Sequence, residues 1–244
     1  MRQVAERNAG TSGGLIWEVI HPLSMVLIFW FVFAVGFKAE GPGGMPFILY
    51  FATGMLSWLT FASVFNAAVN GVVSNSHLVR RTTFPTEVLP FVYLLSAIVS
   101  HIILLVIVLL VMLCYGWKIS WSVLQLPYYF TGMAVLLLGL SWLTSALNVI
   151  NRDVGQFVRV LIEVWFWMTP VVWVAEMVPE KYRWIFILNP MCYVIQGYRN
   201  ALLFNGYFWE DGFSATCFWP EVLIILFIGA YVFKRLKPDF VDVI

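Results

Sequence analysis

Charge is the scarcest property of this sequence. Of its 244 residues, 11% are Asp, Glu, Lys or Arg, 61% are hydrophobic, and the formal net charge at pH 7 is +1. A soluble domain averages about 25% charged residues, so the composition excludes an ordinary soluble domain. The near-zero net charge also lacks the electrostatic attraction on which binding to a nucleic acid depends, and we expect no nucleic-acid partner.

Residues that bind metals or nucleotides are few and scattered. The three histidines, His21, His77 and His101, lie in separate segments, so they do not have the spacing of a zinc site. The sequence contains no G-x-x-x-x-G-K-[ST] motif, which would hold nucleotide phosphates. We therefore expect this chain to bind no cofactor itself.

Long hydrophobic runs are what the sequence has in abundance. A membrane-spanning helix needs about 20 mostly apolar residues, whereas a transmembrane β-barrel shows short segments of alternating polarity, which are absent here. The runs predict an all-α polytopic membrane protein. Its six transmembrane helices are expected at about residues 22–37, 47–70, 89–116, 124–150, 155–175 and 218–236, with Pro170 kinking the fifth.

Two further segments are neither spans nor simple loops. Residues 1–20 mix charge with apolar side chains, which is typical of a helix at the membrane surface with Trp17 at headgroup level. Residues 176–217 are too apolar for a solvated loop, and we interpret them as one or two short re-entrant helices around Asn189-Pro190. No repeat divides residues 1–244, so we treat them as one domain.

The basic residues indicate an orientation for the six spans. With both termini in the cytoplasm, nine of the 14 Lys and Arg residues fall in cytoplasmic pieces and five in outer pieces. This agrees with the positive-inside rule. Cys192 and Cys217 then share the outer segment and could pair, although their spacing has no disulfide signature.

One short motif raises the question of catalysis. Gly139-Leu140-Ser141 in the fourth span looks like the G-x-S of rhomboid-type intramembrane serine proteases. A nucleophilic serine needs a base within hydrogen-bond reach, and the last span, which supplies that histidine in rhomboids, has none. His101 in the third span would be the remaining candidate. The alternative interpretation is a small-residue face for helix packing, and we favour it.

Charged residues within the spans are nearly confined to Arg159 and Glu163. Four residues apart at the start of the fifth span, they share one helix face. They could form a local ion pair reaching toward the cytoplasm, which we favour, or brace the inner mouth of a pathway. Aromatic residues are abundant and default to an interfacial belt. Those of the fifth span could alternatively line a channel and stack on sugars: Trp165, Phe166, Trp167 and Trp173.

The stretch S-N-S-H-L-V-R-R-T-T-F-P-T-E-V-L-P-F, residues 74–91, separates the second and third spans. Arg80 and Arg81 satisfy the positive-inside rule, but that rule does not explain the Phe-Pro-Thr-Glu that follows. Pro85 pushes the preceding residue out of helical geometry, so a short helix should end before it. The stretch therefore has the character of a stiff, charged element that contacts a partner.

Five motifs together resemble the membrane subunits of ABC-2 type exporters, especially those for O-antigen, capsule or teichoic-acid polysaccharide. In chain order they are Gly14-Leu15-Ile16-Trp17 with Pro22, Val79–Pro90 with its R-R-T-T-F-P-T-E-V-L-P, Asn148–Val154 (N-V-I-N-R-D-V), Phe166–Val172 (F-W-M-T-P-V-V) and Leu188–Met191 (L-N-P-M). The resemblance covers nearly the whole chain. One departure is Ala9–Ser12, where relatives usually carry more basic residues.

The resemblance implies specific roles for these motifs. Residues 74–90 would form a coupling helix docked on a separate ATPase subunit through Arg80, Arg81, Phe84, Pro85 and Glu87. Arg152-Asp153 would be either a second contact with the ATPase or partner copy, or a surface ion pair. The surface helix at the N-terminus would carry Arg7, Gly14 and Trp17.

The resemblance also implies an assembly. Two copies of this chain would pair with two ATPase subunits, which hold ATP and Mg²⁺, in the bacterial inner membrane. The chain itself would not be an enzyme, and lipid-linked polysaccharide would pass between the two copies. An exporter of a small lipid, drug or oligosaccharide, and a structural or receptor bundle, are the alternatives that the sequence leaves open.

Overall fold

The structure is a computed structural model that describes residues 20, 24–79, 84–210 and 212–243. Within these residues it is helical, without a β-strand beyond a single bridge between Glu40 and Pro46. Four helices are long and apolar enough to cross a membrane: α3 (Phe47–Val69), α6 (Leu89–Cys114), α7 (Leu126–Ile150) and α11 (Gly212–Leu236). A shorter apolar helix, Ser24–Gly36, and α8 (Asp153–Met168) occupy the positions of the first and fifth predicted spans. The chain is an all-α polytopic membrane protein, as predicted.

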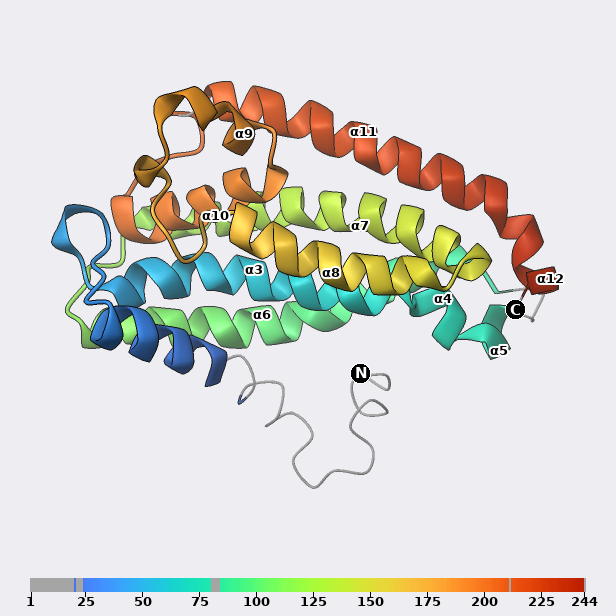
Figure 1. The fold of residues 1–244 in the computed structure, drawn as a ribbon, viewed down its shortest axis with the longest axis horizontal. Helices are drawn as coiled ribbons and strands as arrows, with labels where there is room; N and C mark the ends of the chain where they lie inside the picture. Colours follow the sequence, from blue (N-terminus) through green and yellow to red (C-terminus); the bar gives the residue numbers. More distant parts are fainter. Residues whose placement is uncertain (1–19, 21–23, 80–83, 211, 244) are drawn as a thin grey trace.

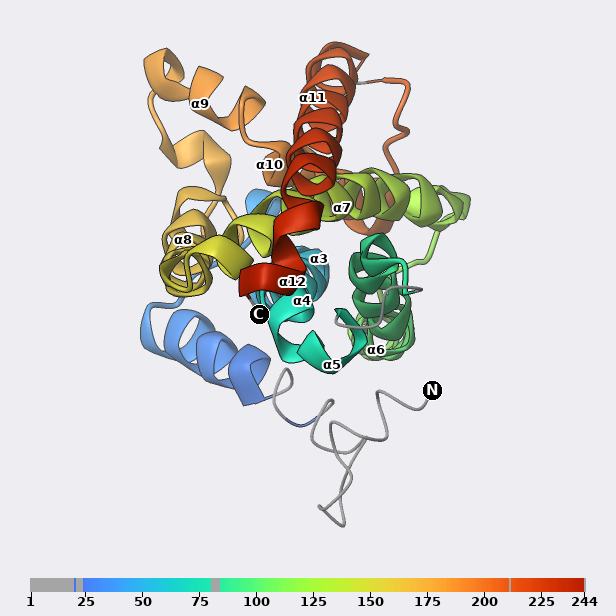
Figure 2. The same ribbon diagram turned by 90° about the vertical axis from the view of Figure 1, so that its right-hand side faces the viewer.

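The long helices lie roughly parallel, and α3 is their centre (Figures 1 and 2). Most side chains of α3 are buried, because α6, α7, α8 and the helix α10 (Pro190–Arg199) all contact it. In contrast, α6 and α11 expose many apolar side chains on their outer faces, for example Leu95 at 63% and Phe227 at 69%. Exposed apolar surface of this kind is what a helix facing lipid presents.

The packing of α7 on α11 explains the Gly139-x-Ser141 motif. A Cβ atom on Gly139 would lie 2.7 Å from the backbone of Leu226, and one on Gly229 would collide with the Gly139 carbonyl. The two helices therefore approach at a pair of glycines, as small-residue faces in membranes do. Both ring nitrogens of His101 contact other groups, the hydroxyls of Thr60 (2.8 Å) and Tyr198 (3.0 Å). The motif is a packing face.

Two predicted boundaries of the spans are wrong. The fifth span does not continue through a kink at Pro170, because α8 ends at Met168 and Thr169 is extended (φ −101°, ψ 134°). A residue before proline avoids helical geometry, and here that preference terminates the helix. The last helix begins at Gly212 rather than near residue 218, with Pro220 inside its first turns. Pro220 lies in the interior of this helix, where a proline removes one hydrogen bond to the carbonyl four residues earlier.

Within residues 176–217, two short helices lie on either side of Asn189-Pro190. They are α9 (Trp184–Ile187) and α10, which continues into a π-helix at Asn200–Phe204. Asn189 caps α10, since its side-chain oxygen accepts a hydrogen bond from the Met191 N–H (3.1 Å). Of the cysteines in this region, Cys192 is buried on α10, and both it and Cys217 are free thiols, so the disulfide that the sequence left open is not formed.

The molecule has two distinct ends, named here for the helices that mark them (Figure 1). The α9 end holds α9, the end of α10 and the π-helix Asn200–Phe204 that follows it. The α5 end holds α4 (Gly71–Ser74), α5 (Ser76–Val79), the first turn of α8 and α12 (Phe240–Val243). The 3-10 helix Thr86–Val88 leads from the α5 end into α6.

Candidate functional site

The turn between α4 and α5 is fixed by the side chain of Asn75. Its amide donates hydrogen bonds to the Gly71 carbonyl (2.8 Å) and to the Tyr93 hydroxyl (3.1 Å). The Tyr93 ring lies only 2.6 Å from where a Cβ on Gly71 would be, so a larger residue at position 71 would displace it. These contacts hold the α4–α5 turn against the first turns of α6.

An apolar cluster attaches this turn to four other helices, and we call it the α5-end cluster. It is separate from the main core, and α4, α5, α6, α7, α11 and α12 all contribute to it. Its buried members are Val72, Val79, Leu89, Ala146, Val149, Phe233 and Phe240, with Val73, Phe84, Trp142 and Leu236 packed against them. The half-buried ring of Phe84 thus contacts its own chain. A displacement of the 71–90 segment would move the ends of α7 and α11 with it, because close-packed side chains transmit strain.

Glu87 connects the same segment to α7 and to the end of α11 through polar contacts. The Lys237 ammonium donates a hydrogen bond to its carboxylate (2.6 Å), and the indole N–H of Trp142 donates to its backbone carbonyl (3.1 Å). The side chains of Glu87 and Lys237 are 41% and 38% exposed. The ion pair is therefore partly solvated, and its contribution to stability is small, about 0–1 kcal/mol.

Asn148, near the end of α7, joins α3 to α8. Its amide donates to the Val69 carbonyl (3.1 Å) and the Asn70 side-chain oxygen (3.3 Å), while its own oxygen accepts the Gly155 N–H (2.8 Å). The side chain is 2% exposed. A Cβ on Gly155 would lie 3.0 Å from the side-chain oxygens of both asparagines, so glycine gives α8 its close approach to this joint.

Arg152 and Asp153 follow this joint on the surface of the α5 end. Both side chains are exposed, and they form no ion pair with each other or with another described residue. The Asp153 N–H is bonded by the Asn151 side-chain oxygen (2.9 Å), which fixes the start of α8. The surface ion pair that the sequence allowed is absent within the described residues, and both charges remain open to solvent.

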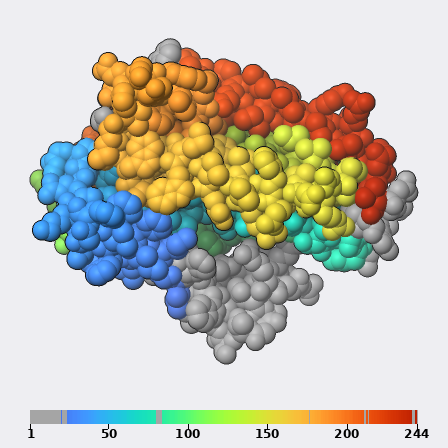
Figure 3. All heavy atoms as spheres, in the orientation of Figure 1, coloured from blue at the N-terminus to red at the C-terminus, as the bar shows by residue number. Residues whose placement is uncertain are grey.

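The exposed face of α8 is unusually polar for a helix among membrane spans. Gln156, Arg159 and Glu163 lie along it at spacings of three and four residues, and all three are exposed. The ion pair predicted between Arg159 and Glu163 is wrong for the described part of the chain, which contains no contact of that kind between them. Figure 3 shows this helix as a yellow band running along one face of the molecule.

The aromatic residues at the end of α8 pack mainly within their own chain. The indole N–H of Trp165 donates to the Asn189 side-chain oxygen (2.8 Å), and that of Trp173 donates to the Trp167 carbonyl (3.2 Å). Phe166 contacts Trp58 with 5.5 Å between ring centroids. Trp165, Phe166 and Trp173 are half-buried, and Trp167 is 56% exposed. Of the four proposed lining residues, Trp167 presents the most surface.

Arg199, at the end of α10, is a charged side chain that the chain buries completely. Its guanidinium donates hydrogen bonds to the carbonyls of Pro170 and Val171, both at 2.7 Å, and to the Tyr50 hydroxyl at 2.9 Å. It also lies 3.6 Å from the centroid of the Tyr50 ring, a cation–π contact. Arg199 thereby holds the non-helical residues after α8 against α3 and α10.

Comparison with known proteins decides the family. The profile of the ABC-2 type transporter family matches residues 1–203 of the 244. This chain belongs to the ABC-2 type transporter family. It is also 27% identical to an O-antigen export system permease protein RfbA of Klebsiella pneumoniae, over 95% of this chain and 87% of that protein. A protein of the same name from Myxococcus xanthus is 23% identical over 99% of this chain and 92% of its own length. The ABC-2 chain is therefore a membrane-embedded component of a transporter.

The structure places part of the predicted coupling site of this ABC-2 transporter chain. Phe84, Pro85 and Glu87 lie in one segment at the α5 end, and Arg152 and Asp153 lie at the same end. Arg80 and Arg81 lie outside the described residues, as do three members of the predicted surface helix, Arg7, Gly14 and Trp17. The described members are thus brought together at one end of the bundle.

Sequence reasoning missed three residues that organise the ABC-2 chain. Arg199 and Lys237 were assigned to loop and terminal pieces, yet one is buried and the other is bonded to Glu87. Asn148 was noticed only as part of a motif. The one signal for Arg199 was its position directly after the mostly apolar residues 190–198. These follow Asn189-Pro190, a typical helix start, and Arg199 could therefore lie at a buried helix end.

Proposed function

We propose that this chain is the transmembrane subunit of an ATP-driven exporter that moves lipid-linked polysaccharide, of the O-antigen or capsule type, outward across the bacterial inner membrane. The extent of similarity carries the proposal. Proteins named as O-antigen export permeases align with 95% or more of this chain. The four long apolar helices and the polar face of α8 support the same reading, since they suit a transporter with a water-accessible path.

ATP and Mg²⁺ bind to two copies of a separate ATPase subunit in this proposal, and the present chain performs no bond chemistry. The ATPase docks at the α5 end, where His77, Arg152, Lys234 and Arg235 are exposed. Arg80 and Arg81 belong to residues 74–90, the segment that contains His77 and is proposed to dock on the ATPase. The double substitution Arg80→Glu with Arg81→Glu is expected to abolish co-purification of the ATPase or its glycan-coupled hydrolysis. Normal coupling in that variant would contradict the docking site.

Movement of the docked loop is passed on through three described contacts. Glu87 transfers it to α11 through Lys237 and to α7 through Trp142. Asn148 connects α7 to the end of α3 and the start of α8. A displacement at Glu87 therefore reaches α11 and α7, and through Asn148 the adjoining ends of α3 and α8.

Two copies of the chain enclose the path for the polymer. Polar and charged side chains within membrane helices face protein or water rather than lipid. Gln156, Arg159 and Glu163 on the exposed face of α8 consequently face the second copy or the path between the copies. This places α8 and the neighbouring helix Ser24–Gly36 at the interface. In this proposal the α5 end faces the cytoplasm, the side on which both termini are also proposed to lie, and the α9 end faces outward.

The test of this function is depletion of the protein in its own host, followed by analysis of lipid-linked glycans. Accumulation of a long glycan inside the cell, together with its loss from the surface, is the expected result, and the accumulated polymer identifies the substrate. An unchanged surface without internal glycan would contradict polysaccharide export and favour a small amphiphile as the cargo.

A further inference from the structure

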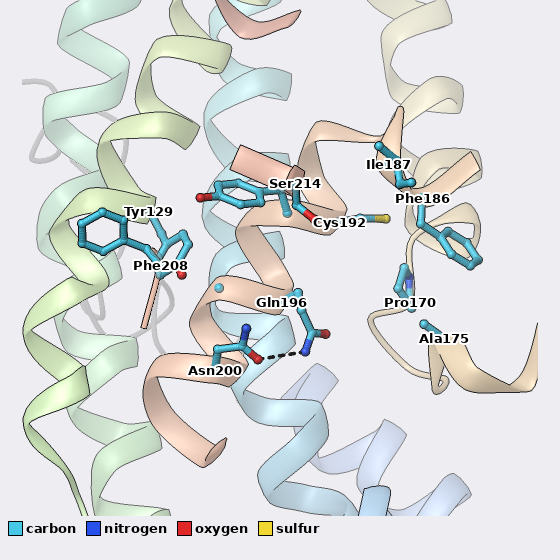
Figure 4. Close-up of a pocket in the computed structure, with 12 residues that line it drawn as sticks. Tyr129, Pro170, Ala175, Phe186, Ile187, Cys192, Gln196, Asn200, Phe208 and Ser214 are labelled. Atoms are coloured by element: carbon cyan, nitrogen blue, oxygen red, sulfur yellow. Dashed lines mark hydrogen bonds between the residues drawn. The ribbon is translucent and has the colours of Figure 1, made fainter. Parts of the chain in front are cut away.

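A cavity of about 220 Å³ lies near the α9 end and is not part of the site described above. One wall is the exposed side of α10, and the other walls come from residues 170–187, from residues 208–214 and from Tyr129 of α7, so four separate segments form it. Figure 4 shows Gln196 of α10 beside Asn200, the first residue of the following π-helix, with Pro170, Ala175, Phe186 and Ile187 on one side of them and Tyr129 and Phe208 on the other. The cavity is smaller than the about 300–1,000 Å³ of sites for drug-sized ligands.

The polar groups of the cavity form an oriented pair. Gln196 donates an amide hydrogen bond to the Asn200 side-chain oxygen (3.0 Å), one helical turn away. Among the described residues, the Gln196 oxygen and the Asn200 amide nitrogen have no other hydrogen-bond partner. An acceptor and a donor thus stand next to each other, which matches a pair of neighbouring hydroxyl groups, each able to donate and to accept.

Rigid aromatic rings flank these amides. Tyr193 is stacked on Phe218 and Phe208 is stacked on Tyr128, each with 4.5 Å between ring centroids. The hydroxyl groups of Tyr193 and Tyr128 are hydrogen-bonded to each other (3.1 Å), which fixes both rings. Aromatic faces that are held in place by packing offer contact area at little cost in conformational entropy. They suit the C–H face of a sugar ring.

Charge is missing from the described lining. Among the residues whose side chains the structure describes, no Asp, Glu, Lys or Arg forms part of the cavity wall. A phosphate or an acidic headgroup would therefore have no counter-charge there, while a purely apolar ligand would leave the two amides without partners, at a cost of about 1–3 kcal/mol each. A neutral, hydroxyl-rich ring of small size satisfies both the amides and the aromatic faces.

We propose that this cavity binds a single neutral sugar residue of the exported glycan as it leaves the transporter. The inference rests on the proposed function, because it takes the α9 end as the outer side and the glycan as the cargo. Such a site would bind the glycan weakly between cycles of ATP hydrolysis and would oppose its movement back into the transporter. A neutral sugar of a membrane glycolipid has the same chemistry, and the experiment below separates the two sources.

The experiment measures protection of a cysteine placed in the cavity. The native Cys114, Cys192 and Cys217 are replaced by Ser or Ala, and Gln196→Cys is labelled on intact spheroplasts with a membrane-impermeant maleimide. One strain makes the glycan and the other lacks its synthesis. The matched control is Met177→Cys, which is 76% exposed in the same outer segment and does not line the cavity. Ser214→Cys, in another wall, is a second reporter that leaves both amides intact.

Labelling of Gln196→Cys and Ser214→Cys is expected to be several-fold slower in the glycan-making strain, with Met177→Cys unaffected. Equal labelling in both strains while export proceeds would overturn the proposal. Equal protection in both strains, with Met177→Cys still reactive, would show an enclosed or glycolipid-filled cavity and would also overturn it. If depletion causes glycan to accumulate but protection is absent, the cavity assignment alone fails. If no glycan accumulates on depletion, the proposed function fails.

Discussion

Lys237, the residue after the end of α11, donates a 2.6 Å hydrogen bond to the carboxylate of Glu87 across 150 residues of sequence. Glu87 belongs to the segment that would contact the ATPase, and Lys237 belongs to the last long helix. The half-exposed pair adds little stability, about 0–1 kcal/mol. Its value lies in joining the two elements directly, so its removal should affect transport far more than folding.

Asn148→Asp should uncouple the transporter. A carboxylate still accepts the Gly155 N–H, but it repels the Val69 carbonyl and the Asn70 oxygen to which the amide now donates. We expect export to fall several-fold and the protein to lose about 1–3 kcal/mol of stability. Export assays and thermal unfolding of the purified complex measure the two effects. Asn151→Asp is the matched control, because its carboxylate can still accept the Asp153 N–H; equal effects of the two variants would argue against a joint at Asn148.

Arg199→Ala should destabilise the α9 end. The substitution leaves the Pro170 and Val171 carbonyls without donors in a buried position, at about 1–3 kcal/mol for each. Arg199→Lys keeps the charge but loses the two-pronged geometry of the guanidinium, and we expect an intermediate loss. Arg183→Ala, which removes an exposed 3.8 Å ion pair with Glu180 and an exposed 3.3 Å hydrogen bond to the Val178 carbonyl, serves as control and should be nearly neutral. Equal melting temperatures for Arg199→Ala and Arg183→Ala would refute the role given to Arg199.

Gly229→Ala should separate α7 from α11. The added methyl group would collide with the Gly139 carbonyl, and overpacking of this kind costs about 1–3 kcal/mol. Gly212→Ala lies on the same helix with open space around it and should change little. The measurement is the fraction of monodisperse protein after heating. A Gly229→Ala protein as stable as Gly212→Ala would mean that the helices are not this close.

Ser141→Ala tests whether the chain is a hydrolase. Ser141 is 1% exposed on α7, and the two ring nitrogens of His101 contact Thr60 and Tyr198. We expect export at the wild-type rate. Loss of activity at unchanged protein abundance would show that the serine performs chemistry and would remove the packing interpretation.

The spans were predictable because each is a long apolar run, and α3, α6 and α7 begin and end within a few residues of the predicted positions. The end of α8 was not predictable, because composition alone does not reveal whether a proline kinks a helix or terminates it. Here the carbonyls of Pro170 and Val171, which follow the extended Thr169, have a buried partner in Arg199, 28 residues or more away. That tertiary contact supplies hydrogen-bond donors to the carbonyls after the helix end, and no local sequence pattern encodes it.

The location of the coupling segment was predictable from the sequence, but the contacts through which it connects to the rest of the bundle were not. Arg80–Pro90 stands out by its charges and prolines, whereas the contacts that connect it to the bundle involve Trp142 and Lys237, which look ordinary in sequence. Motif Asn148–Val154 shows the same limit. Its conspicuous residues, Arg152 and Asp153, are exposed, while the less conspicuous Asn148 is buried and bonded to two other helices.

The most direct test of the account is a charge exchange at Glu87 and Lys237, measured as glycan exported per ATP hydrolysed by the assembled transporter. Glu87→Lys and Lys237→Glu should each lower this ratio several-fold with little change in melting temperature, and the double variant, which restores the ion pair in reverse, should recover most of it. Single variants that export normally, or a double variant no better than either single one, would contradict transmission of the ATPase movement through this contact.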